Sequence, residues 1–150
     1  MSDQQKAQVL LSECSKRFGM ESQEPITDLQ ITLDNGLSLF VDHLEPVAKL
    51  MFTVPITEMN GTDTVATYLE LLELNLYGEE LAGGQFALAQ PSNEIVLIKQ
   101  VDISSQDPAT FCDSFTEFIE TATVWYEAFH GAYADRHVPI SHQDKGVVKV

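Results

Sequence analysis

The sequence predicts an α+β fold in which three helices pack against a twisted, mostly antiparallel sheet of five strands. The chain has 150 residues, of which 44% are hydrophobic, so it fits one compact domain with its own core. Three segments space their apolar residues at the helical period of about 3.6, and the segments between them alternate or run continuously apolar, as strands do. Caps and turns separate these segments, which predicts the order helix, three strands, helix, two strands, helix.

The first helix is expected over residues 3–18. Leu11, Cys14 and Phe18 lie on one apolar face of that segment, and Gly19 supplies the residue type at which helices commonly end. The helix is therefore amphipathic, with one face directed at the core.

Three strands are expected to follow. Apolar residues alternate over residues 29–33 and again over 37–41, and the Asp-Asn-Gly sequence at 34–36 tolerates the positive φ of a hairpin turn. The third strand is expected over residues 47–56. Pro55 predicts a sheet edge or the end of that strand, because proline has no N–H to donate to a ladder.

The second helix is expected over residues 62–77, between an Asn-Gly-Thr-Asp capping cluster and Gly78. Its apolar surface is too wide for one neighbour, because one stripe contains Val65, Leu69, Leu72 and Leu76 and a second contains Tyr68, Leu71 and Leu74. The stripes either pack inside one chain or partly against a second copy. We expect a homodimer, with an interface formed by Val65, Tyr68, Leu69, Leu71, Leu72 and Leu76.

Two more strands and a long helix complete the domain. The strands are expected over residues 85–90 and 94–101, and the second has a continuous apolar run at 95–98, so it is either central in the sheet or covered by a partner. The last helix begins at the cap Asp107. Its apolar face is formed by Phe111, Phe115, Phe118, Ala122, Trp125, Phe129 and Ala132. The domain is expected to span residues 1–134, and residues 135–150 are expected to be a mobile tail.

The charge of the chain excludes several classes of partner. It carries 23 acidic and 8 basic residues, a formal net charge of −15. Nucleic acid and anionic membranes both require a basic footprint, so neither is expected as a partner. Lys99 is the one basic residue between residues 51 and 135, against fourteen acidic ones. No signal peptide or apolar span is visible, and a cytoplasmic location is expected.

Residues that could carry catalysis are scarce. His43 and His130 are isolated, and His137 and His142 would form only a loose metal site on the predicted tail. No glycine-rich phosphate loop is present. Two cysteines, one in each terminal helix, are expected to be buried structural thiols. We therefore expect no catalytic, cofactor-binding or metal-binding residues, and binding rather than catalysis.

The order of elements, the small size and the acidity resemble the class I chaperones of bacterial type III secretion, the Tir-chaperone-like family. LELLELNLYG at 69–78, which contains Asn75, is similar to the leucine-rich dimerisation helix of that family. GGQFALAQ at 83–90 and EIVLIKQVDI at 94–103 resemble its paired strands, and the long last helix with Trp125 fits as well. The resemblance covers about residues 5–134.

The resemblance implies a bacterial cytoplasmic homodimer without enzymatic activity or cofactor. Such a protein binds the N-terminal, non-globular segment of a cognate effector and keeps it soluble and secretion-competent. A client in extended form would add to strand edges and place side chains in apolar grooves. By resemblance, the first helix and the adjacent sheet face form such a groove, although each of its residues could equally fill the core. The candidate effector-binding residues are Leu11, Cys14, Phe18, Leu39, Val41, Phe86 and Leu88.

Three alternatives remain from the sequence. A regulatory binding protein of the same fold, coupling secretion to transcription, would have the same apolar grooves. An acidic mimic of nucleic acid would need a regular array of surface carboxylates. A small hydrolase would show turnover of ester or phosphate substrates.

Overall fold

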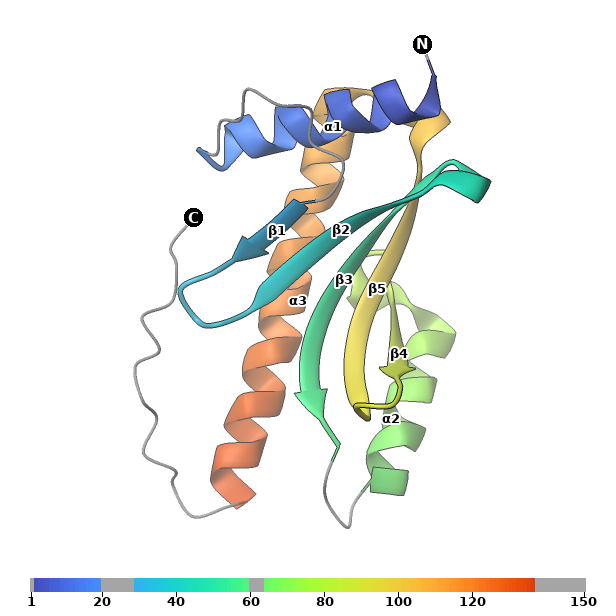
Figure 1. Ribbon diagram of the computed structural model, residues 1–150. Helices are drawn as coiled ribbons and strands as arrows, with labels where there is room; N and C mark the ends of the chain where they lie inside the picture. The colour runs from blue at the N-terminus through green and yellow to red at the C-terminus, as the bar shows by residue number, and fades with distance from the viewer. Residues whose placement is uncertain (1, 20–28, 60–63, 137–150) are drawn as a thin grey trace.

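The computed structural model describes residues 2–19, 29–59 and 64–136 (Figure 1). It confirms the predicted order of helices and strands. The elements are α1 (Asp3–Arg17), β1 (Leu29–Thr32), β2 (Ser38–Leu44), β3 (Lys49–Glu58), α2 (Thr64–Tyr77), β4 (Gln85–Ala89), β5 (Glu94–Asp102) and α3 (Pro108–Arg136). Three short 3-10 turns join some of them: η1 (Glu45–Val47), η2 (Glu79–Leu81) and η3 (Ile103–Ser105).

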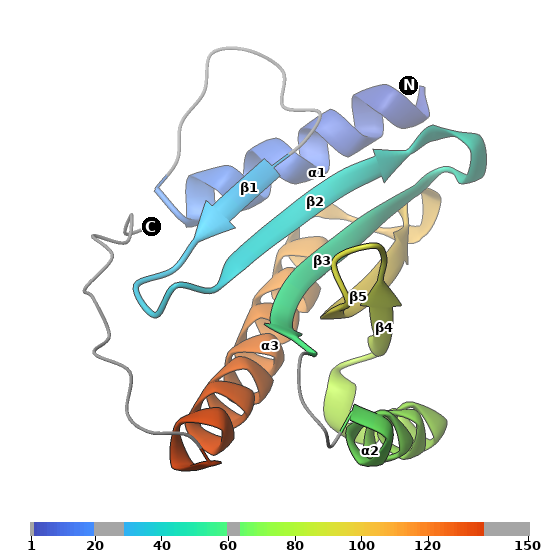
Figure 2. The ribbon, with the colours of Figure 1, turned by 60° about the horizontal axis from the view of Figure 1, so that its bottom comes forward.

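The five strands form one twisted sheet in the order β1-β2-β3-β5-β4, and all of its neighbouring pairs are antiparallel. Helices α1 and α3 lie on one face of the sheet and contact each other. Helix α2 packs beside β4, at the opposite end of the molecule from α1 (Figures 1 and 2). The long helix α3 therefore packs against α1, β3 and η2.

Helix α1 begins at a capping box. The Gln5 N–H donates to Ser2 Oγ at 3.2 Å, and the Ser2 N–H donates back to Gln5 Oε1 at 2.9 Å. The helix ends before Gly19, whose φ of +74° is left-handed, as the sequence predicts.

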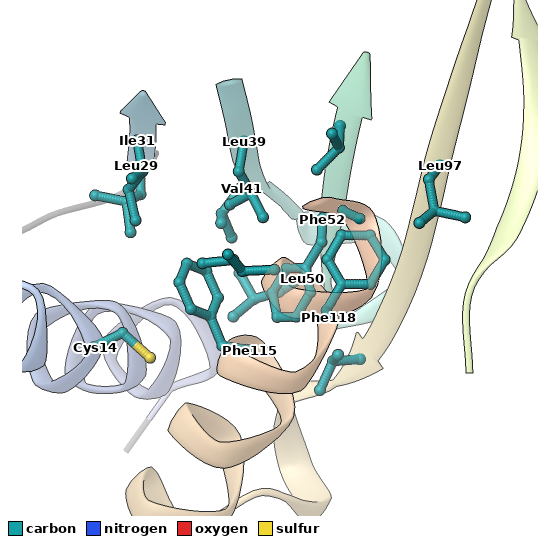
Figure 3. Close-up of a cluster of buried hydrophobic side chains, with 14 of the residues drawn as sticks. Cys14, Leu29, Ile31, Leu39, Val41, Leu50, Phe52, Leu97, Phe115 and Phe118 are labelled. Atoms are coloured by element: carbon teal, nitrogen blue, oxygen red, sulfur yellow. The ribbon is translucent and has the colours of Figure 1, made fainter. Parts of the chain in front are cut away.

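The core centres on aromatic side chains between the sheet and α3. Phe52 of β3 makes edge-on contacts with Phe111 and Phe115, with ring centroids 5.6 and 5.2 Å apart, and a tilted contact with Phe118 at 5.5 Å. Figure 3 shows Phe52, Phe115 and Phe118 gathered beneath the strands. All four of these phenylalanines are fully buried. The aromatic face of the last helix thus closes the core, as expected.

Of the two expectations for Pro55, the end of strand β3 is wrong and a local sheet edge is confirmed, because among the described residues β3 pairs only with β5 at this position. The strand continues to Glu58, and Pro55 pairs with Val96 of β5 at a shift of register between Pro55 and Thr57. Such a bulge takes the chain off the regular ladder, which allows proline inside a strand. The β2–β3 pairing stops at Thr53, so β3 extends past β2 at this point.

Gly84 allows the turn before β4 to lie directly on β5. A Cβ atom at this position would lie 2.8 Å from the Ile98 carbonyl oxygen and 3.0 Å from the Leu81 carbonyl oxygen. Both neighbours are backbone atoms, so a side chain here would require the hairpin to move. The glycine pair of the sequence therefore marks a close approach of two chain segments.

Several expectations fall partly or wholly on segments that are not described. Helix α3 includes residues 135 and 136, so it continues past the expected start of the tail. Residues 137–150, with two of the histidines, lie outside the described residues, as do the linker at 20–28 and the capping cluster at 60–63.

Candidate binding and dimerisation surfaces

One apolar stripe of α2 is exposed on the single chain. Its four members have exposed fractions of 63–75%: Val65, Leu69, Leu72 and Leu76. Isolated exposed apolar residues are ordinary, but three leucines and a valine on one helix face form a contiguous patch of the kind that marks an association site. These four residues belong to the expected dimer interface.

The second stripe of α2 packs inward. Leu71 is only 5% exposed and belongs to the core, while Tyr68 and Leu74 are partly buried against it. Two residues of the expected interface, Tyr68 and Leu71, are therefore engaged by their own chain. The structure thus shows which of the two predicted stripes is buried and which is exposed.

Asn75 fastens α2 to the outer edge of β4. Its side-chain amide donates to the Phe86 carbonyl oxygen at 2.9 Å and accepts the Phe86 N–H at 2.7 Å. The amide thereby makes both hydrogen bonds that a neighbouring strand would make at this position. It therefore covers part of one sheet edge and links α2 to β4.

Most of the candidate effector-binding residues lie inside the single chain. Leu11, Cys14, Leu39 and Val41 are fully buried, and Phe86 is nearly so. Figure 3 shows Cys14, Leu39 and Val41 among the buried side chains. These five side chains fill the core, which is the alternative that the sequence left open. A client that binds the folded chain therefore contacts the surface residues around these side chains and not the side chains themselves.

The two remaining candidates are accessible. Leu88 of β4 is 40% exposed. Phe18 follows the last turn of α1 and is partly buried, with its ring edge-on to Phe115 at a centroid distance of 5.5 Å. The C-terminal end of α1 lies beside β1 in both views (Figures 1 and 2).

Strand β1 is the other edge of the sheet. It pairs with β2 on one side, and no strand of the described residues pairs with its other side. An unpaired edge offers a row of backbone donors and acceptors for another extended segment. The resemblance implies strand addition without identifying the strand, because edge position depends on pairing between distant segments.

An acidic pocket of about 510 Å³ lies between α2, η2 and α3. The Trp125 indole N–H at its wall donates to the Glu80 carbonyl oxygen at 3.3 Å. Sequence reasoning missed this pocket, because the glutamates of α2 have the spacing of an ordinary solvated helix face. It is lined by Glu70, Glu73, Leu74, Tyr77, Glu79, Glu80 and Trp125.

Lys99 does not offset this acidity at the surface. Its ammonium donates to the Ala82 carbonyl oxygen at 2.8 Å and to Ser114 Oγ at 2.9 Å. Burial lowers the pKa of Lys99, and the nearby Glu117 carboxylate partly opposes that effect. The single cation of residues 51–135 is therefore used to join β5, the turn before β4 and α3.

The two histidines within the described residues, His43 and His130, have different surroundings. His130 Nε2 lies 2.9 Å from the Ile56 carbonyl oxygen, and its ring makes a tilted contact with Tyr126. His43 Nε2 is buried and has no hydrogen-bond partner among the residues that the structure describes. Among the described residues, no three His, Cys, Asp or Glu side chains are placed to hold a metal ion.

None of the described helices combines the length and hydrophobicity that crossing a bilayer requires.

The comparisons with known proteins identify the family. The model of the Tir chaperone protein (CesT) family matches residues 9–126. A comparison with curated proteins gives no match.

Solved structures share the fold. The ExsC-ExsE complex matches with 14% identity and a TM-score of 0.62, covering 95% of this chain and 100% of that one. The HopA1-SchA chaperone-effector complex matches with 14% identity and a TM-score of 0.61, covering 81% and 94%. The Yersinia pestis type III secretion chaperone SycH, in complex with a stable fragment of YscM2, matches with 16% identity and a TM-score of 0.59, covering 79% and 98%. Because the family model spans most of the sequence and the fold agrees with it, this chain belongs to the Tir chaperone protein family.

Proposed function

We propose that this protein is a homodimeric type III secretion chaperone of the bacterial cytoplasm. It binds the N-terminal, non-globular segment of a cognate effector and keeps that segment soluble and secretion-competent. It acts by stoichiometric binding, without catalysis, cofactor or metal. Family membership supports this role, and similar folds occur in complexes described as chaperone and effector.

The observation that carries the proposal is apolar surface left over by a domain whose core is already closed. The aromatic core is fully buried, yet the stripe of Val65, Leu69, Leu72 and Leu76 stays more than half exposed. We assign this stripe to the dimer interface, with Tyr68 at its margin and Leu71 as the buried support beneath it. A second copy would cover the patch by an isologous contact.

The client is proposed to bind at the open edge of β1 and beside the end of α1. An extended segment would pair with residues 29–32 through its backbone and place alternate side chains toward Phe18. Leu88, at the opposite edge of the sheet, offers a further apolar contact. The buried candidates, Leu11, Cys14, Leu39, Val41 and Phe86, are proposed as the support of this surface.

The test is co-expression with the product of the neighbouring gene, followed by light scattering and native mass spectrometry of the purified complex. We expect a dimer of this chain bound to one partner chain, and loss of binding when the N-terminal non-globular segment of the partner is deleted. A monomer that retains no partner would contradict the proposal. Export of the partner in secreting cells separates an effector chaperone from the regulatory alternative, whose partner is not exported.

A further inference from the structure

The two cysteines of the chain meet at the contact between the first and last helices. Cys14 of α1 and Cys112 of α3 are 98 positions apart in sequence, and their sulfur atoms are 2.8 Å apart. Both are free thiols and both are buried. The sequence predicts that each is buried but contains no sign that they meet.

We propose that Cys14 and Cys112 form a redox-sensitive dithiol, which hydrogen peroxide oxidises to an intramolecular disulfide joining α1 to α3. This inference goes beyond the chaperone function and does not depend on it. Its consequence for the fold is a covalent tie between α1 and α3, which lie on the same face of the sheet and contact each other.

The geometry favours the bond. A disulfide has an S–S distance of about 2.05 Å, so the two sulfurs need to approach by only about 0.8 Å from their separation of 2.8 Å. An exposed ion pair beside them also links the two helices, because Arg17 Nη1 lies 2.9 Å from Asp113 Oδ1. Arg17 is one turn after Cys14, and Asp113 directly follows Cys112.

The chemistry balances with peroxide as the oxidant. The thiolate of one cysteine attacks a peroxide oxygen, the O–O bond breaks, and the hydroxide that leaves takes up a proton to become water. The product is a sulfenic acid. The second thiol then attacks the sulfenic sulfur, an S–S bond forms, the S–O bond breaks, and a second water leaves. In total, two thiols lose two electrons and two protons to one peroxide molecule.

The environment makes this reaction slow and restricts the oxidant. Burial raises the pKa of the Cys14 thiol well above its ordinary value, and the contact with Cys112 raises it further, while Arg17 opposes both effects. The Cys14 thiolate is therefore scarce at neutral pH, and oxidation that begins at Cys14 accelerates as the pH rises. A small neutral oxidant suits a site enclosed between two helices. The pair responds to sustained exposure rather than to a brief pulse.

The test treats the full chain with hydrogen peroxide, then denatures it and alkylates the remaining thiols for intact mass spectrometry. We expect the number of alkylated thiols to fall from two to none at the mass of a single chain. A non-reducing peptide map should contain one cross-link, between the peptides of Cys14 and Cys112. The melting temperature should rise by roughly 10 °C, because the bridge closes a long loop, and dithiothreitol should reverse the rise.

Single variants provide the control. In Cys14→Ser and Cys112→Ser, the remaining thiol has no partner, so its sulfenic acid should be trapped by dimedone and the melting temperature should not rise. If serine disrupts the core, Cys14→Ala and Cys112→Ala serve the same purpose with an apolar side chain. Two alkylatable thiols after prolonged treatment of the wild-type protein, or a cross-link between two chains, would overturn the proposal.

Discussion

Asn75 shows how one polar side chain organises an apolar helix. Its amide makes two hydrogen bonds to the backbone of Phe86 at the outer edge of β4. In Asn75→Leu, the Phe86 N–H and C=O would both lose their partner in a partly buried site. We expect the free energy of unfolding to fall by about 1–3 kcal/mol, the usual cost of leaving such groups unsatisfied. Urea unfolding followed by circular dichroism measures the change.

Two further variants separate the hydrogen bonds from the packing. Asn75→Asp keeps an acceptor for the Phe86 N–H but places a second oxygen against the Phe86 carbonyl, so it should also destabilise the fold. Glu73→Gln, on an exposed face of the same helix, should leave stability nearly unchanged. Hydrogen exchange of the Phe86 amide should accelerate in Asn75→Leu, and unchanged exchange would show that Asn75 does not hold this edge.

At the level of elements, α3 depends on the cap at its first turn. The Asp107 carboxylate accepts the Thr110 N–H at 2.9 Å and the Thr110 hydroxyl at 2.8 Å. These hydrogen bonds hold the pKa of Asp107 below its usual value. The folded state therefore binds a proton less readily than the unfolded chain. The stabilisation is complete above the unfolded pKa of about 3.9 and is lost as the pH falls through the lower folded value.

Asp107→Asn tests this dependence. Asparagine keeps a capping oxygen but neither titrates nor carries the charge that favours a helix N-terminus. We expect wild type to melt at a higher temperature than Asp107→Asn at pH 6, and the difference to shrink as the pH is lowered below 4. Glu120→Gln, at an exposed position in the middle of α3, should show no comparable convergence. A difference in melting temperature that stays constant down to pH 2 would mean that protonation of Asp107 does not affect the stability of the fold.

The elements themselves were predictable because each one carries local signals. The aromatic period after Asp107, the stop at Gly78 and the alternation on either side of residues 34–36 depend only on nearby residues. What covers each apolar face depends on distant segments, and periodicity alone cannot resolve it. Leu71 and Leu72 are neighbours in sequence, yet one is in the core and the other is exposed. Leu11 of α1 and Val41 of β2 were expected to line a groove, and both are fully buried in the core instead.

Helix α2 provides the test of the dimer. In Leu72→Asp, a carboxylate would lie in the centre of the proposed interface, where desolvation without a partner is costly. Because Leu72 is 64% exposed in the single chain, the variant should fold and should shift the mass from dimer to monomer in light scattering.

Two other positions make that result specific. Val124 of α3 is also 64% exposed but lies outside the α2 stripe, so Val124→Asp should remain a dimer. Leu71→Asp places the charge in the core, so it should lower the melting temperature sharply rather than yield a folded monomer. A Leu72→Asp protein that keeps the dimer mass would place the interface elsewhere.

For the whole molecule, hydrophobic surface and charge have to be considered together. A chain with an exposed leucine stripe is at risk of nonspecific association, and a net charge of −15 opposes it through repulsion between copies. The same charge acts against dimerisation, so the proposed interface has to be apolar enough to overcome it. Because Lys99 donates its hydrogen bonds within the chain, the fourteen acidic residues between 51 and 135 present a negative electrostatic field to an approaching client.

This field predicts a salt-dependent association with a client segment of net positive charge. We expect the association rate, measured by stopped-flow fluorescence, to fall roughly tenfold or more from 50 to 500 mM salt, because added ions screen long-range attraction. The dissociation rate should change much less, since apolar and backbone contacts determine it. Replacing Glu73, Glu79 and Glu80 with glutamine removes three charges from the acidic pocket. This variant should bind more slowly than wild type at low salt and show a smaller salt dependence, and an association rate that ignores salt in both proteins would rule out electrostatic steering.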